Sequence, residues 1–224
     1  MPEQLFDNWP DKYRRWFETP IGRLVKEYEL RLILRLLQPQ PDELILDAGC
    51  GNGIFTQPML DAGAQVVGVD LSAPMLSAAR RELKGDRFAA SVGNICALPF
   101  ADHTFDKVVS ITALEFIEDA QSAINELFRV SRTGGSVVVA TLNSLSPWAE
   151  RRIKEAEADP DSVFREIHFR SPAELSALAA PPARVKTAIH FPKSATQREA
   201  VRLEAEGEAR NRDRGAFVIA RWMV

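Results

Sequence analysis

Three glycines and one carboxylate are the first residues whose spacing could do chemistry. Gly49, Gly51 and Gly53 alternate in the segment DAGCGNG, and Asp47 stands directly in front of them, after the apolar run ELIL. A glycine turn that joins a strand to a helix lets a ligand approach the backbone closely. Such turns often bind phosphate at the helix N-terminus, but Asp47 would repel a phosphate. The segment therefore predicts a ligand that carries a cationic group.

A second group of residues points to a nucleoside. Asp70 ends the next apolar run, QVVGVD, where an acid can accept hydrogen bonds from ribose hydroxyls. Leu71 and Met75 follow it and are expected to pack on the face of a base. Further on, the Asn94 side chain could accept from an exocyclic amine and the Ile95 N–H could donate to a ring nitrogen. S-adenosylmethionine, a cationic amino acid joined to a nucleoside, fits both groups.

Alternating strand and helix patterns must position these residues. Five compact apolar runs are predicted strands, at residues 43–49, 65–70, 87–93, 105–112 and 134–142. The segments 53–61, 73–83 and 118–131 are predicted helices, and Ser72 is expected to cap the second of them. This alternation is typical of a doubly wound α/β fold, in which helices cover both faces of a parallel sheet. Two late strands, at 183–191 and 215–224, are predicted to form an antiparallel hairpin at the sheet edge.

The flanking segments are expected to belong to the same single domain, residues 1–224. Before Pro39, apolar residues recur at helical spacing, whereas the polar segment after Asn143 carries Trp148, Phe164 and Phe169 and is predicted to cover the ligand. The predicted parts are a helical N-terminal cap (1–40), a ligand-binding core (42–143), a lid (144–170), and a C-terminal helix with edge strands (171–224).

The bulk composition excludes several classes of protein. The 224 residues are 46% hydrophobic and 26% charged, with a formal net charge of −3, so the basic field of a nucleic-acid binder is missing. Cys50 and Cys96 form no paired motif, so no metal site is expected. No run suits a signal peptide or a membrane span, which predicts a cytoplasmic protein without stable membrane association. The pattern specifies no oligomeric state.

Four segments, in order and spacing, resemble the class I S-adenosylmethionine-dependent methyltransferases, most closely the small-molecule group with quinone- and sterol-type members. They are ILDAGCGNG, VVGVD, GNICALPFADHTFDKVVS and LFRVSRTGGSVVVATLN, and they cover roughly residues 42–143. GAFVIARW looks like the last strand of that fold, and YRRWFETPIGRLVKEYE like a helical cap of some members. The resemblance implies a Rossmann-like seven-stranded sheet whose last strand is antiparallel.

The same resemblance implies binding of S-adenosylmethionine, with S-adenosylhomocysteine as the product. By this resemblance, the methionine part of the ligand would be held by Asp47, Gly49, Gly51 and Gly53. Asp70 would bind the ribose, and Asn94 and Ile95 the adenine. Thr112 and Ala113 would line the pocket of the methyl donor. Tyr13 or Trp16 of the cap is expected to close over the ligand.

Two positions depart from the family pattern. Many relatives have Asp where this chain has Asn94, which keeps an acceptor oxygen, and many read Leu-Glu-His where Phe116 removes the histidine. Methyl transfer to a neutral oxygen or nitrogen can need a general base. The candidates, in declining order, are His168, His190, Glu115 and His103.

The acceptor expected from the sequence is a small organic molecule. Neither an [N/D]-P-P-[Y/F] tetrapeptide nor a Pro-Cys pair is present, which argues against adenine, glutamine and cytosine C5 as acceptors. A binding module that no longer transfers methyl stays an alternative, and so does aminopropyl transfer. A nicotinamide-dependent oxidoreductase is disfavoured by Asp47, by Ile54 in place of a glycine, and by the missing Tyr-x-x-x-Lys motif.

Overall fold

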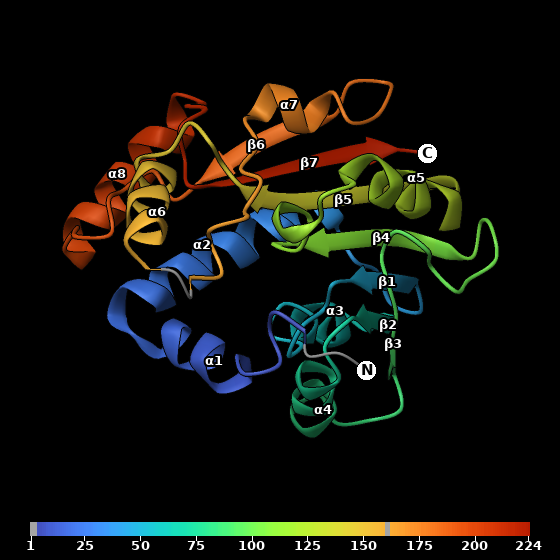
Figure 1. Ribbon diagram of the computed structural model, residues 1–224. Coiled ribbons are helices and arrows are strands. Elements are labelled where there is room, and N and C mark those ends of the chain that lie inside the picture. The colour runs from blue at the N-terminus through green and yellow to red at the C-terminus, as the bar shows by residue number, and fades with distance from the viewer. Residues whose placement is uncertain (1–3, 160–161) are drawn as a thin grey trace.

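The computed structural model describes residues 4–159 and 162–224. Within these ranges seven strands form one sheet in the order β3-β2-β1-β4-β5-β7-β6 (Figure 1). The strands are β1 (Leu44–Ala48), β2 (Gln65–Asp70), β3 (Phe88–Val92), β4 (Phe105–Ile111), β5 (Ser131–Leu142), β6 (Arg184–Ala188) and β7 (Phe217–Met223). Strands β1 to β5 are parallel, and β7 is antiparallel to both of its neighbours. The predicted seven-stranded sheet with an antiparallel last strand is confirmed.

Helices cover both faces of the sheet (Figure 1). They are α1 (Pro10–Glu18), α2 (Pro20–Leu37), α3 (Gln57–Asp61), α4 (Ala73–Glu82), the 3₁₀ helix η1 (Leu114–Phe116), α5 (Ala120–Val130), α6 (Pro147–Ala158), α7 (Pro172–Ser176) and α8 (Gln197–Ala209). One apolar core joins the sheet to α2, α3, α6 and α8, and the other joins it to α5 and α7. Successive strand residues divide between the cores: Ile45 faces the first and Leu46 the second. The doubly wound arrangement follows from this alternation.

Local signals fix the helix starts. The Thr19 hydroxyl accepts from the Gly22 N–H at the beginning of α2. At the beginning of α4 the Ser72 hydroxyl accepts from the Met75 N–H, so the predicted Ser72 cap is confirmed. Helix α2 ends where Gln38 takes a left-handed backbone, just before Pro39.

Two elements differ from the sequence-based expectation. The helix predicted over 53–61 begins only at Gln57, because the glycine turn keeps its left-handed backbone as far as Gly53. By contrast, β6 and β7 pair antiparallel at the edge of the sheet, as predicted, and β7 is the strand of this pair that also pairs with β5. In the segment 144–170, of which 160–161 lie outside the described residues, most of the first half is helix α6.

No helix in the described part of the chain is both long enough and apolar enough to cross a membrane.

Candidate functional site

A cavity of about 540 Å³ lies at the carboxyl ends of the parallel strands. One side, which we call the loop side, is formed by the segments that follow β1 to β4. The other, the helix side, is formed by α1, α2, α6, η1 and Phe164. Because the carboxyl ends of the strands in an open α/β sheet are where ligands bind, this cavity is the candidate site.

Most of the predicted site residues meet at this cavity. Those that line it are Tyr13, Gly49, Gly51, Asp70, Leu71, Met75, Asn94, Ile95, Thr112 and Ala113, together with Trp16. Asp47, Gly53 and His168 do not line it.

The glycine turn gives the loop side an exposed backbone. Gly49, Gly51 and Gly53 all have positive φ, at 81°, 53° and 79°. A Cβ on Gly49 would lie 2.4 Å from the Cβ of Ala113, so no larger residue fits there. A Cβ on Gly51 would meet only the flexible end of Met75, at 3.3 Å. The turn therefore brings bare backbone to the cavity, as the ligand prediction requires.

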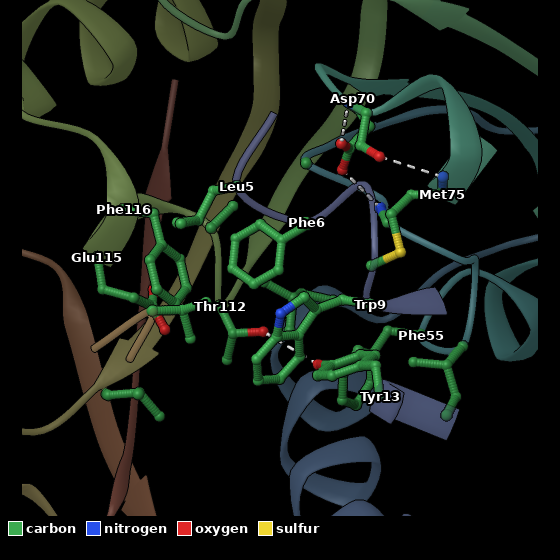
Figure 2. A pocket seen from close by; sticks show the side chains of 18 of the residues that line it. Leu5, Phe6, Trp9, Tyr13, Phe55, Asp70, Met75, Thr112, Glu115 and Phe116 are labelled. Carbon is green, nitrogen blue, oxygen red and sulfur yellow. Dashed lines mark hydrogen bonds between the residues drawn. The ribbon is translucent and has the colours of Figure 1, made fainter. Parts of the chain in front are cut away.

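Asp70 faces the turn from the end of β2 (Figure 2). Its carboxylate accepts from the Gly51 N–H at 2.8 Å and from the Ser72 N–H at 2.9 Å. Burial raises the pKa of Asp70, and the two backbone hydrogen bonds oppose that shift. A carboxylate has about four acceptor positions, so Asp70 keeps capacity for two hydroxyl groups of a ligand in the cavity.

Asp47 does not occupy the place expected for it. Its side chain is 2% exposed and lies beneath the turn, where it accepts a hydrogen bond of 2.6 Å from the Thr56 hydroxyl. Burial raises its pKa to about 7, although the Thr56 hydrogen bond lowers it. Asp47 does not line the cavity and accepts from the Thr56 hydroxyl just before α3, and its contact with the ligand stays a prediction.

Gly53 and His168 also lie outside the cavity lining. A Cβ on Gly53 would lie 2.6 Å from the Leu83 side chain, so this glycine allows the turn to pack against the end of α4. His168 is exposed, and only its backbone N–H reaches the site region, donating to the Glu115 carbonyl at 2.8 Å. The assignment of His168 as the general base is therefore not supported.

The loop after β3 carries Asn94 and Ile95 to the cavity. The Asn94 side-chain oxygen accepts from the Cys96 N–H at 2.9 Å, so it braces its own loop. Ile95 is 7% exposed and packs close to Gly49. The oxygen of Asn94 keeps a second lone pair for a ligand.

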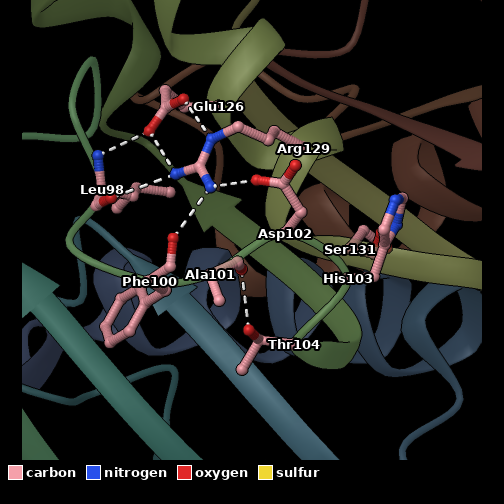
Figure 3. Close-up of polar contacts among 9 residues, drawn as sticks. All are labelled: Leu98, Phe100, Ala101, Asp102, His103, Thr104, Glu126, Arg129 and Ser131. Carbon is pink, nitrogen blue, oxygen red and sulfur yellow. Dashed lines mark hydrogen bonds and ion pairs between the residues drawn. The ribbon is translucent and has the colours of Figure 1, made fainter.

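Arg129 of α5 holds the far part of the same loop (Figure 3). Its guanidinium donates to the carbonyls of Leu98 and Phe100, at 3.1 and 2.8 Å, and pairs with Glu126 and Asp102. Glu126 in turn accepts from the Leu98 N–H at 2.7 Å. Charge-assisted hydrogen bonds of this kind are the strong ones, so the loop is fixed to α5.

Thr112 lies where the loop side meets the helix side (Figure 2). Its φ is 48°, a left-handed backbone that β-branched residues rarely adopt. Its N–H donates to the Ala140 carbonyl at 2.9 Å, and its hydroxyl lies 3.5 Å from the Tyr13 hydroxyl. Strained backbone of this kind gathers at functional sites, which supports the choice of this cavity.

Buried charges distinguish the helix side. Glu29 of α2 is 5% exposed and Glu115 of η1 is 0% exposed, and both line the cavity with Arg152 of α6. Burial raises the pKa of Glu29 to about 8 and that of Glu115 to about 7, while Arg152 lowers both. The sequence-based analysis missed Glu29 and Arg152. Glu29 carries a signal that could have found it, since it stands four residues from Val25 and from Ile33 on the apolar face of α2.

The segment before α1 passes over the cavity. Phe6 makes edge contacts with Phe116 and Trp9, at ring-centre distances of 4.8 and 5.8 Å (Figure 2). Asp7 accepts a hydrogen bond of 2.7 Å from the Ser72 hydroxyl at the start of α4. We call residues 4–9 the roof segment. Phe116, which replaces the histidine of many relatives, is a contact for this roof.

Among residues 4–159 and 162–224, His, Cys, Asp and Glu side chains form no group of three or more suited to hold a metal ion.

Comparison with known proteins identifies the central part of the chain. The model of the methyltransferase domain family matches residues 46–139. A malonyl-[acyl-carrier protein] O-methyltransferase of Pseudescherichia vulneris is 40% identical over 140 residues, which cover 58% of this chain and 55% of that protein. A demethylmenaquinone methyltransferase of Renibacterium salmoninarum is 36% identical over 110 residues, covering 49% and 46%. The chain thus spans about half the length of these curated relatives.

Solved structures match over nearly the whole chain. An S-adenosylmethionine-dependent methyltransferase of Thermotoga maritima superimposes with a TM-score of 0.77 at 24% identity and covers 97% of both chains. A phosphoethanolamine N-methyltransferase of Haemonchus contortus, in complex with S-adenosylhomocysteine, has a TM-score of 0.68 at 18% identity and covers 97% of this chain and 58% of its own. At these identities the match establishes the fold.

Proposed function

Because residues 46–139 form a class I S-adenosylmethionine-dependent methyltransferase domain, we propose that this protein transfers a methyl group from S-adenosylmethionine to a small organic acceptor. The observation that carries the proposal is Asp70. It ends β2, lines the cavity and is bonded to the glycine turn through the Gly51 N–H.

The residues of the loop side fit S-adenosylmethionine. The bare backbone at Gly49 and Gly51 would hold the amino-acid end, Asp70 the ribose hydroxyls, and Leu71 and Met75 the adenine face. Bound there, S-adenosylmethionine supplies a methyl group on a positively charged sulfur. The buried Asp47 carboxylate lies behind the turn and, once ionised, favours a cation in the cavity.

The helix side would receive the acceptor. Placing an acceptor atom in line with an activated methyl group supplies much of a methyl-transfer rate, so a cavity that orients both molecules is the main requirement. The roof segment and the aromatic side chains around it keep water out. Glu115 is the group placed to take a proton, because its Oε2 accepts from the Thr141 hydroxyl while its Oε1 has no partner among the described residues.

Thermal unfolding with added ligands tests the donor assignment. At 100 times Kd a ligand adds about 2.7 kcal/mol to the free energy of unfolding, which raises the Tm of a chain of this size by about 5–11 °C. We expect this rise with S-adenosylmethionine and with S-adenosylhomocysteine, but not with NAD. The reverse pattern would refute the proposal.

Two variants locate the binding site in the same assay. Asp70→Ala should abolish the rise in Tm, because the ribose loses its acceptor. Asp86→Asn, an exposed acid between α4 and β3, should leave it unchanged. Incubation with a methyl-labelled donor and a metabolite extract then separates an enzyme from a binding module, since only an enzyme passes label to an acceptor.

A further inference from the structure

We infer that the helix side binds a cationic amine as the methyl acceptor, with the ammonium group held by the carboxylates of Glu29 and Glu115. This inference rests on the proposed methyl transfer and names the chemical class of its acceptor.

The first observation is a pair of buried carboxyl oxygens without partners. Within the described ranges, Oε2 of Glu29 and Oε1 of Glu115 accept no hydrogen bond, although both side chains are buried and line the cavity. Leaving a buried polar atom unpaired costs about 1–3 kcal/mol, and more for a charged group. An ammonium group offers three N–H donors and no acceptor, so it matches two carboxylates.

The second observation is the charge balance. Arg152 is the cavity cation that acts on both glutamates, yet among the described residues it forms no ion pair with either within 4.0 Å. Its guanidinium lies over the rings of Trp148 and Phe164, at 5.6 and 5.3 Å from their centres. Two other cations line the cavity, but Arg151 pairs with Glu155 at 2.6 Å and Lys193 lies over the Trp16 ring. With both glutamates ionised, the one arginine that acts on both of them therefore faces two negative charges. A cationic ligand supplies the missing positive charge.

A second arginine acts on Glu115 from outside the cavity lining. Arg170 also acts on Glu115, but its guanidinium donates to the carbonyls of Leu114 and His168 and does not line the cavity. It therefore fixes the backbone of η1 and leaves the inward oxygen of Glu115 open to a ligand.

The third observation is the apolar wall around these charges. Trp9, Trp16, Phe116 and Phe164 line the cavity, and Tyr13 lies between the carboxylates and the loop side. Aromatic faces attract cations, and three of these four rings already lie beside one: Arg152 is 5.3 Å from the centre of Phe164, Lys193 is 5.4 Å from Trp16, and Lys12 is 5.6 Å from Trp9. An amine with an apolar body suits such a wall.

The proposed transfer conserves atoms and charge. The acceptor enters as an ammonium ion, and Glu115 takes one proton from its nitrogen, so an N–H bond breaks and the carboxyl becomes neutral. The nitrogen lone pair then forms the N–C bond to the methyl carbon. The C–S bond of the donor breaks, and its electron pair stays on sulfur. The products are a methylated ammonium ion and the neutral thioether S-adenosylhomocysteine.

The experiment compares small molecules that share a carbon skeleton but carry an amine, an alcohol or a carboxylic acid. Titration calorimetry is run on the full chain saturated with S-adenosylhomocysteine. The ligands are a series of amines from ethylamine to tryptamine. For each amine, the alcohol and the carboxylic acid with the same carbon skeleton are also tested. We expect amines to bind and to accept labelled methyl, and the matched acids and alcohols to do neither.

Two variants test whether the carboxylates of Glu29 and Glu115 bind the amine. Glu29→Gln and Glu115→Gln should each weaken amine binding about ten-fold or more, with affinity for S-adenosylhomocysteine unchanged. Glu27→Gln on the exposed face of α2 and Glu118→Gln just after η1 are the matched controls, and they should bind amine as the wild type does.

The outcomes separate this inference from the proposed function. Failure of the wild type to bind S-adenosylhomocysteine refutes the proposed function itself. Normal binding of S-adenosylhomocysteine without binding of any amine in the series overturns the inference alone. Binding of the acids, lost on Arg152→Leu, also overturns it and assigns the helix side to carboxylates.

Discussion

At the scale of single residues, two glycines with the same backbone conformation have different surroundings. Gly49 and Gly51 both have positive φ, but an added Cβ would strike the Ala113 side chain at Gly49 and would face the cavity at Gly51. At Gly49 the missing side chain therefore also allows packing against Ala113, whereas at Gly51 it leaves space in the cavity.

We expect Gly49→Ala to cost about 3 kcal/mol, the sum of a strained φ and an overpacked contact, and Gly51→Ala to cost about 1 kcal/mol from its φ alone. Urea unfolding of both variants measures the difference. Gly51→Ala should nevertheless bind S-adenosylhomocysteine more weakly than the wild type, because its methyl group enters the cavity. Equal stability losses would show that Ala113 moves aside.

The two aspartates at the strand ends show the limit of sequence reasoning at this scale. Asp47 and Asp70 follow similar apolar runs, yet Asp70 lines the cavity and Asp47 is buried beneath the turn. The pattern places both at the right edge of the sheet, but the direction of a side chain at a strand end depends on the turn that follows. His168 is exposed and does not line the cavity, which its sequence could not indicate, since an aromatic segment says little about which of its side chains face inward.

At the scale of elements, α5 and the loop after β3 act as a unit through Arg129. Arg129→Met removes the hydrogen bonds to the carbonyls of Leu98 and Phe100 and leaves Glu126 without its cation. We expect a loss of about 2 kcal/mol in unfolding free energy, with faster hydrogen exchange over residues 94–104.

Arg132→Met is the matched control for that variant. Arg132 pairs with Asp106, but its side chain is 57% exposed, so the loss should stay below about 1 kcal/mol. Similar losses in the two variants would contradict the assigned role of Arg129.

Most strands and helices were predictable because each carries its own periodicity and cap. The order of β6 and β7 beside β5 was not predicted, since pairing between distant strands leaves no local signal. The start of α3 was also misplaced, because the turn continues through residues that have ordinary helix propensity.

At the scale of the whole molecule, three buried carboxyl groups set the pH dependence of stability. Burial raises the pKa of Asp47 and Glu115 to about 7 and that of Glu29 to about 8. The facing groups are Thr56 and Asp70 for Asp47, and Arg152 with Tyr13 for the two glutamates, with Arg170 also acting on Glu115.

With the pKa raised on folding, the folded state binds more protons than the unfolded state between about pH 4.5 and 8. Stability is then full below the unfolded pKa and falls as pH rises, by at most about 1.4 kcal/mol per pH unit for each group. Glu29→Gln should flatten this fall between pH 6 and 8 in urea unfolding, while Glu27→Gln should follow the wild type. A fall of unchanged slope in Glu29→Gln would show that Glu29 titrates normally.

The cavity is lined by two parts of the chain, and the family match covers only one of them. The loop side lies within residues 46–139, which match the domain family, whereas Glu29 and Arg152 lie outside that range. The donor could therefore be predicted from sequence motifs. The acceptor side could not, because Glu29 and Arg152 come from helices outside the matched range and meet at the cavity only in the folded chain.

The position of β7 in the sheet also affects how the chain folds during its synthesis. Strand β7 fills the space between β5 and β6, yet it is synthesised after both of them. Until residues 217–223 emerge from the ribosome, β6 has no partner and one edge of β5 is open, and open strand edges invite pairing with other chains. Nascent chains arrested before residue 217 should therefore recruit chaperones, and release of the finished strand should end that dependence.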